Sequence, residues 1–443
     1  MKKIFTILSI FFIVESVFAQ NVAEFSLEQA KKYALEHNYN NQKSKLDIKI
    51  AKKKVTEIRA IGLPQVNAEA KVQKFLDVAT SLAPANAFNP AAPAGELAEL
   101  QFGLDYNNSV GITASQLIFD GSYIVGLQAA KTYREVSVNN QIKTEVELKE
   151  AIVQAYFTVL VANENAEVLN QSLTSTEKML TETKALYEVG LIEEQSVDQL
   201  MLTTNELKTS VGIANGQIEF AEKLLKLQMG IDIDSVIFLS DNIDAFVSNI
   251  SLEPLQKEFN VVNHIDFQLI EGNVRLMKLN LRKEKYSFLP SLNVFFNHQQ
   301  QNMSNEFDMF SGGDWYPMTV VGASLKLPIL TSGSRLAKMS QAKIEFDKAE
   351  IDAEQVEQNL KYQSQLSKSN YETEYETYSN QKSNLELAKK IYDKTIKKYK
   401  EGVASSLELS QTQNQYLNAE GKYIKSLFDL LKAKSALEKS YGK

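Results

Sequence analysis

Apolar and aromatic side chains recur at heptad spacing over long stretches of the chain, with polar residues between them. One series comprises Tyr371, Tyr378, Leu385, Tyr392 and Tyr399, which is the spacing of a coiled-coil seam. After Gly402 two such series lie beside each other, one of Leu417, Ile424 and Leu431 and one of Tyr416, Tyr423, Leu430 and Leu437. A helix in a pair needs one seam, whereas a helix in a closed ring needs two. The pattern therefore predicts a ring of helices.

The helices that carry these series are predicted to be very long. No glycine or proline occurs from Ser334 to Glu401, and the stretch from Ser122 to Val189 contains only Gly126. At about 1.5 Å per residue, the first stretch alone would span about 100 Å. Few partners in a compact globule could cover so long a helix. We therefore predict two long helical hairpins, at 122–229 and 334–441.

Alternation of apolar and polar residues, the pattern of β-strands, occurs in four other segments: 65–76, 107–119, 291–301 and 318–330. Strands of about ten residues with one apolar face are typical of barrels that meet lipid outside and water inside. Four strands are too few to close such a barrel, because the smallest membrane barrels have about eight. The chain is therefore predicted to combine its strands with those of other copies. The stretches at 83–100 and 298–315 are predicted to be surface loops.

The two halves of the sequence repeat the same order of segments. Residues 187–191 match residues 399–403 at an offset of 212, and Leu63-Pro64 matches Leu289-Pro290 at an offset of 226. Self-similarity of this kind indicates an internal duplication. We therefore divide the chain into a first repeat at 20–230, a linker at 231–262 and a second repeat at 263–443.

Residues 1–19 have the features of a secretory signal peptide. Lys2 and Lys3 precede an apolar run that is too short to span a bilayer, and small residues precede a cleavage site before Gln20. After Ala19 there is no apolar run of about 18 residues, so the sequence predicts no transmembrane helix. A closed barrel is then the remaining way for the chain to span a membrane.

Composition narrows the range of functions. The formal net charge is −7, and no basic footprint for nucleic acid is present in the sequence. The chain has no cysteine, which excludes disulfides and a lipid anchor through cysteine. The three histidines, His37, His264 and His298, have no second ligand at metal spacing. We therefore expect no metal, no other cofactor and no catalytic grouping.

Each half follows the order helix, Leu-Pro, strand pair, Phe-Asp-Gly or a variant, long helix, Tyr-x-x-Gly and return helix. This duplicated order resembles the TolC-like family of outer-membrane efflux and secretion channels, over essentially the whole mature sequence. The resemblance implies an internally duplicated α+β membrane protein that forms a homotrimer. Twelve strands would make one β-barrel in the outer membrane, and the helices would make a mostly α-helical coiled-coil barrel in the periplasm.

The resemblance also implies partners. A channel of this kind is embedded in outer-membrane lipid and conducts passively, without catalysis. The tips of its helical hairpins meet a periplasmic adaptor, or membrane fusion protein, which links the channel to an inner-membrane transporter. Residues that match the adaptor-contacting tips of the family are Val189, Gly190, Leu191, Gly402 and Val403.

Residues near the second tip match the periplasmic entrance of the family. Tyr399 corresponds to a tyrosine that helps to hold the entrance shut, and Glu408 and Gln411 occupy the positions of two acidic rings, so one ring is retained. The basic and acidic residues of a salt-bridged latch are replaced by Ala404 and Ser196. A hydrogen bond from Tyr399 to Ser196 is the alternative, with Glu193, Glu194 or Asp198 as replacement charges.

Two other classes of protein compete with the channel. An exported coiled-coil scaffold would explain the heptads but not the alternating segments, and an exported hydrolase would need a catalytic constellation that the sequence lacks. Cargo selection is expected in the inner-membrane partner, so drugs, metal ions and polypeptides are equal alternatives.

Overall fold

A computed structural model describes residues 23–101, 103–243, 246, 251, 258–307 and 313–442. The predicted signal peptide at 1–19 lies outside the described residues. Long helices and a strand layer are both present, which confirms the predicted α+β class. The chain divides into two compact units, of which unit 1 contains segments 1–43, 143–264 and 360–443 and unit 2 contains 44–142 and 265–359.

These packing units differ from the predicted sequence repeats, which divide the chain into 20–230, 231–262 and 263–443. Each unit takes segments from both repeats, because equivalent segments of the two repeats pack together. The strand pairs of both halves lie in unit 2, and both helical turns lie in unit 1. The repeats are therefore units of sequence and not of packing.

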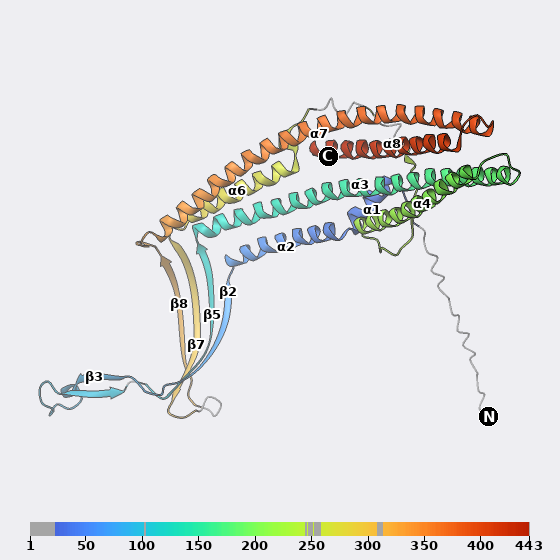
Figure 1. The fold of residues 1–443 in the computed structure, drawn as a ribbon. Coiled ribbons are helices and arrows are strands. Elements are labelled where there is room, and N and C mark those ends of the chain that lie inside the picture. Colours follow the sequence, from blue (N-terminus) through green and yellow to red (C-terminus); the bar gives the residue numbers. More distant parts are fainter. Residues whose placement is uncertain are drawn as a thin grey trace, which may run out of the picture. The chain divides into compact units, whose positions relative to one another are not determined.

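Unit 2 contains one antiparallel sheet of four long strands in the order β2-β5-β7-β8, seen side by side in Figure 1. The strands are β2 (Gln65–Lys74), β5 (Tyr106–Phe119), β7 (Ser291–Ser304) and β8 (Tyr316–Lys326). The central pair joins the two repeats, and β2 and β8 are the edges. Among the described residues, neither edge strand has a partner on its outer side.

The register aligns the apolar residues of all four strands on one face of the sheet. Val66 is opposite Ala114, Ala114 is opposite Phe296, and Phe296 is opposite Val321. The neighbouring row on the other face is polar on three strands, with Asn67, Thr113 and Asn297, and ends in Val320 on β8. Asn297 Nδ2 donates to Thr113 Oγ1 at 2.8 Å. Val66 and Val321 remain exposed in the single chain. The predicted two-faced strands are present, and these apolar side chains are left without cover.

Strand ends differ from their predicted positions by a few residues. The predicted strand at 318–330 ends at Lys326, because Pro328 has no N–H to give to a ladder. The strand predicted at 291–301 continues through Asn302 and Met303 to Ser304, because pairing uses backbone groups whatever the side chains are. β2 ends at Lys74, two residues early. The predicted loop at 83–100 contains most of a two-stranded ribbon, β3 (Thr80–Pro84) with β4 (Leu97–Gln101).

Two shorter helices and parts of two long ones complete unit 2. They are α2 (Tyr39–Ile61), α6 (Ile265–Tyr286) and the first parts of α3 (Gly121–Glu188) and α7 (Ser334–Lys400). Asn280 on α6 donates to Glu345 on α7 at 3.3 Å, so these two helices lie together. The chain between α6 and β7 is only 287–290, which places the end of α6 next to the sheet.

Unit 1 contains the two helical hairpins. The second part of α3 returns through α4 (Glu194–Met229), and the second part of α7 returns through α8 (Ser406–Ser440). The helix α1 (Leu27–His37) and a parallel pair of short strands, β1 (Ala23–Phe25) and β6 (Ile237–Leu239), pack with them. No helix among the described residues has both the length and the apolar content needed to cross a bilayer.

The core of unit 1 uses the predicted heptad series. Tyr371 and Tyr378 of α7 are buried with Leu430 and Leu437 of α8 in one apolar cluster. Tyr156 of α3 is fully buried in the same cluster. Its hydroxyl lies 2.9 Å from the carbonyl oxygen of Phe25 and 3.0 Å from Asp241 Oδ2. Burial and the Asp241 carboxylate both raise the pKa of this phenol.

Candidate functional site: the hairpin tips

Both hairpins turn through the same backbone structure. Gly190 and Gly402 have φ values of 75° and 72°, a left-handed conformation that glycine adopts without steric cost. In each turn the glycine N–H donates to the carbonyl three residues earlier, and the next N–H donates to the carbonyl five residues earlier. These paired bonds form a Schellman motif, which satisfies the last carbonyls of the helix. The equivalent turns place equivalent residues at the two tips.

The tips expose apolar side chains that the chain itself does not cover. The exposed fractions are 69% for Val189, 72% for Leu191 and 73% for Val403. A Cβ added to either tip glycine would meet no atom within 4 Å, so open space surrounds both turns. Exposed apolar residues that cluster at a turn indicate a surface for another protein.

Tyr399 contacts the first hairpin through a hydroxyl group, but not at the expected residue. Its Oη lies 2.8 Å from Thr183 Oγ1 on α3. The predicted Tyr399–Ser196 hydrogen bond is therefore wrong within this chain. Ser196 is instead 3.3 Å from Ser406 Oγ, which donates a shorter bond of 2.6 Å to Gln199 Oε1. The Tyr399 hydroxyl bonds to α3, whereas the Ser196 hydroxyl is engaged by Ser406 of α8.

Further neutral hydrogen bonds join the two hairpins behind the tips. Gln413 Nε2 donates to Thr176 Oγ1 at 2.7 Å, and both residues are fully buried. Thr203 Oγ1 lies 3.2 Å from Ser410 Oγ. Together with the Tyr399–Thr183 contact, these bonds form a hydroxyl and amide ladder between the hairpins. Hydrogen bonds in a buried setting favour one arrangement of the two helix pairs, because leaving either partner unsatisfied is costly.

The charged and polar candidates near the tips face solvent. Glu408 is exposed, and its backbone N–H donates to the capping Ser405 Oγ of α8 at 3.1 Å. Gln411 and Asp198 are also exposed. Among the described residues, the side chains of Glu193, Glu194 and Asp198 make no ion pair, so these three carboxylates form no salt-bridged latch there. These carboxylates lie on the first hairpin, whereas the last turn of α7 in the second hairpin carries Lys397, Lys398 and Lys400.

A signal for the ladder is present in the sequence, although the heptads of apolar residues alone do not reveal it. Thr176 and Thr183 are seven residues apart on α3, and Ser406 and Gln413 are seven residues apart on α8. Their spacing is that of a seam, and all four are buried polar residues. Polar residues at seam positions specify register in coiled coils, so this pattern could have indicated paired contacts between helices.

An aromatic cluster lies beside the ladder. Tyr392 of α7 and Tyr416 of α8 are stacked with ring centroids 5.5 Å apart, and Met179, Leu200 and Leu409 pack around Tyr392. Burial, followed by the Asp393 charge, raises the pKa of Tyr392 to about 12. Burial also raises the pKa of Glu420, although the hydrogen bond from Tyr416 and the charge of Lys389 act in the opposite direction. Both groups therefore keep their protons to a higher pH than they would in water.

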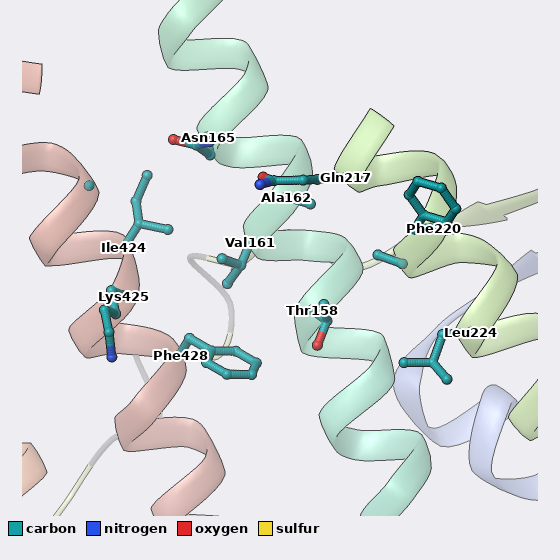
Figure 2. A pocket seen from close by; sticks show the side chains of 12 residues that line it. Thr158, Val161, Ala162, Asn165, Gln217, Phe220, Leu224, Ile424, Lys425 and Phe428 are labelled. Atoms are coloured by element: carbon teal, nitrogen blue, oxygen red, sulfur yellow. The ribbon is translucent and has the colours of Figure 1, made fainter. Parts of the chain in front are cut away.

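A second surface of unit 1 is an apolar groove of about 580 Å³ between α3, α4 and α8 (Figure 2). Phe220 and Leu224 of α4 line one side, Val161 lies on α3, and Phe428 lies on α8. The side chain of Phe220 is 74% exposed. The groove also includes Ile424 of one heptad series of α8, which is itself buried.

Comparisons with known proteins agree with this architecture. A family model described as "Outer membrane efflux protein" matches residues 32–201 and 262–443. The outer membrane protein TolC of Vibrio cholerae is 22% identical over 248 residues, which cover 56% of this chain and 56% of that protein. The outer membrane efflux protein BepC of Brucella suis is 20% identical over 343 residues, covering 76% of this chain and 73% of that protein.

Two solved structures have the same fold. The CmeC outer membrane channel of Campylobacter jejuni has a TM-score of 0.72 at 17% identity, covering 94% of this chain and 85% of that chain. The open state of the MtrE outer membrane channel of Neisseria gonorrhoeae has a TM-score of 0.72 at 18% identity, covering 96% of this chain and 93% of that chain. At these identities the structural likeness shows the fold alone.

Proposed function

The chain belongs to the outer membrane efflux protein family, and we propose that it is the passive outer-membrane duct of an efflux pump or type I secretion system. It lies in the cell outer membrane, with its helices extending into the periplasm. In the proposed role the duct conducts cargo that an energised inner-membrane transporter delivers. No catalytic step is assigned to the chain, and its chemistry is that of assembly and gating.

The two open edges of the sheet carry this proposal. β2 and β8 each leave one side of their backbone unpaired within the described residues, and such edges invite pairing with another chain. Three copies would supply twelve strands, with β2 of one copy beside β8 of the next. The aligned apolar face would meet lipid, and the polar face would line a water-filled pore. A homotrimer satisfies both the backbone and the exposed apolar face.

The apolar groove of unit 1 supports the same trimer. Phe220 is large, apolar and exposed, and the groove around it is open along three helices. A helix of the neighbouring copy would cover Phe220 and Leu224 of α4. Burial of the aromatic ring of Phe220 removes on the order of 100 Å² or more of apolar surface from water, which stabilises the assembly.

We assign the adaptor contact to the tips. Val189, Leu191, Gly402 and Val403 present apolar groups and a backbone turn on an otherwise polar end of the hairpins. A periplasmic adaptor with an apolar helical hairpin of its own would bury these groups. We also assign the closed entrance to the neutral ladder, with Tyr399–Thr183 as its outermost rung and Glu408 as an acidic ring near it.

Recordings from purified protein in planar bilayers, together with its recovery from the outer-membrane fraction, test the duct. The proposal predicts heat-modifiable oligomers on gels and discrete conductance steps. An exported scaffold predicts a water-soluble particle without conductance, and that result would reject the duct.

A further inference from the structure

A second groove, in unit 2, has a composition unlike that of any other surface described above. It has a volume of about 580 Å³ and lies between α3, α6 and α7. Five of its lining residues are basic: Arg275, Lys278, Arg282, Lys285 and Lys343. The remaining lining residues are Thr132, Leu279, Leu281 and Phe346, and no acidic residue is among the described residues that line the groove.

The positive charge of this basic groove is only partly neutralised. Arg275 pairs with Glu135 at 3.7 Å, and Lys343 pairs with Asp347. Arg282 donates to Tyr286 Oη at 3.1 Å and to Gln128 Oε1 at 3.5 Å, which are neutral acceptors. Within the described part of the chain, Lys278 and Lys285 have neither an ion-pair nor a hydrogen-bond partner for their ammonium groups. An anion in the groove would therefore meet two free ammonium groups and one guanidinium.

The floor of the basic groove is apolar. Leu281 is buried, and Leu279 and Phe346 are partly buried beside it. A free inorganic anion would gain nothing from contact with such a floor. A ligand with an anionic head and a hydrocarbon chain would match both parts of the lining.

Charges are segregated between adjacent grooves of the same unit. Toward the start of α6 there is a groove of about 790 Å³. Arg275 is the one basic residue among the described residues that line it, and four lining residues are acidic: Glu271, Glu350, Glu354 and Glu357. The basic groove lies closer to the sheet, because its residues extend to Lys285, one residue before the end of α6. Lys278 is about 12 Å from that end at the helical rise. The cations are therefore concentrated on the part of α6 nearest to the strands.

The sequence has a matching asymmetry along β7 and β8. Lys and Arg are absent from 286–325, which contains β7 and β8 up to Leu325, whereas Arg282, Lys283 and Lys285 come directly before. The loop between these strands contains Glu306 and Asp314 instead. If the sheet spans the outer membrane, the helix end lies at the periplasmic headgroup layer, where phosphate groups are available.

We propose that the basic groove binds the phosphate headgroup of a glycerophospholipid from the periplasmic leaflet, with one acyl chain over Leu279 and Phe346. The proposal rests on the proposed function, which puts the sheet in the outer membrane. Lys278 and Lys285 are the principal phosphate ligands, and Arg282 is freed from Tyr286 to join them. The bound lipid would fix the depth and the tilt of the duct in the bilayer.

Native mass spectrometry of the purified full-length protein with added phosphatidylglycerol tests this site. The double variant Lys278→Ala/Lys285→Ala removes the two free ammonium groups. The matched control, Lys283→Ala/Lys338→Ala, removes two exposed cations outside the groove, one from α6 and one from α7. The first pair should weaken phosphatidylglycerol binding roughly tenfold to thirtyfold, whereas the control should change it less than about twofold.

Each alternative has its own signature. Equal losses in both pairs, or no loss in either, would overturn the site. Displacement of the lipid by millimolar inorganic phosphate would show that the basic groove is a simple anion site. Binding of dodecyl sulfate but not of phosphatidylglycerol would indicate an amphiphilic cargo. Either result would overturn the lipid site. Wild-type conductance in bilayers is measured in parallel. If the wild type forms channels but the Lys278→Ala/Lys285→Ala variant shows no selective loss of lipid binding, this inference alone is rejected. If the wild type forms no channels, the proposed function is rejected.

Discussion

At the residue scale, single hydroxyl groups decide how the two hairpins meet. Tyr399 and Thr183 share a rung near the tips, and Gln413 and Thr176 share a fully buried one. The tyrosine was predictable from the Tyr-x-x-Gly motif, because a tyrosine in a seam next to a turn has few other places to pack. Its partner was not, because a threonine has the same chemistry wherever it occurs on a long helix. Only the packing of α3 against α7 selects Thr183.

Removing the outer rung should open the entrance. Tyr399→Phe and Thr183→Val each delete one half of the hydrogen bond, worth about 1 kcal/mol, and should raise the mean conductance or the open probability in planar bilayers severalfold. Thr181→Val is the control, because this exposed hydroxyl donates only to the backbone of its own helix. Unchanged conductance in both rung variants would show that the contact has no role in gating.

We expect Leu191 at the first tip to contact the adaptor and to have no role in conduction through the pore. Leu191→Asn places a polar group on a side chain position that is 72% exposed, so stability and conductance should remain at wild-type values. Export in cells that contain the cognate adaptor should fall severalfold, because an apolar contact worth about 1–2 kcal/mol is lost. Full export with this variant and with Val403→Asn would contradict the assignment of the tips.

Glu420 gives the hairpins a dependence on pH. Because burial raises its folded-state pKa above the ordinary carboxyl value, its contribution to stability is complete below that ordinary value and is lost as pH rises through the raised pKa. Glu420→Gln keeps a neutral side chain at every pH. The variant should therefore melt at a higher temperature than the wild type at neutral pH and at a similar one in acid.

The measurement for Glu420 is thermal unfolding in detergent micelles from about pH 4 to about pH 8. Glu408→Gln is the matched control, because Glu408 lies on the same helix but is exposed. If the melting temperatures of the wild type and of the Glu420→Gln variant change in parallel with pH, the proposed burial effect is refuted.

At the element scale, periodicity alone predicted most of the helices and strands. Heptads predicted the hairpins that became α3 with α4 and α7 with α8, and alternation predicted β2, β5, β7 and β8. The residues at which the strands end were harder to predict. Pro328 ends β8 through a missing donor, while β7 runs on through Asn302 and Met303 to Ser304 because its backbone still pairs. The β3–β4 ribbon was not predicted, because its Ala- and Pro-rich composition is that of a loop.

Two tyrosines of one heptad series should respond in opposite ways to loss of their hydroxyl. Tyr371 Oη donates to the carbonyl oxygen of Ser251 at 2.7 Å, whereas the buried Tyr378 Oη has no partner among the described residues. Tyr371→Phe should destabilise the fold by about 1 kcal/mol, and Tyr378→Phe should leave it unchanged or slightly more stable. Thermal unfolding of the two variants in micelles measures the difference. Equal destabilisation by both would mean that Tyr378 has a partner that the single chain does not supply.

At the scale of the whole molecule, the duplication indicated which segments are equivalent but not how they pack. It identified the equivalent segments, yet the compact units join equivalent segments of the two repeats and cut across both repeats. Sequence order could not reveal this, because packing pairs Thr113 of β5 with Asn297 of β7 across 184 residues. The closing of the sheet into a barrel is a separate question, because it depends on other copies of the chain. The number of strands and the two unpaired edges make the described sheet incomplete whatever the cargo is.

Disulfide capture between the two edge strands tests this incompleteness most directly. The natural chain has no cysteine, so Ala68→Cys in β2 and a cysteine scanned through 319, 321 and 323 in β8 can report only on each other. Within one chain the two edges are three strand spacings apart, about 14 Å, which exceeds the reach of a disulfide. We predict that mild oxidation of at least one pair yields a covalent band of three chains and nothing larger. Monomers alone for every pair, or an open-ended ladder of polymers, would contradict the trimeric duct.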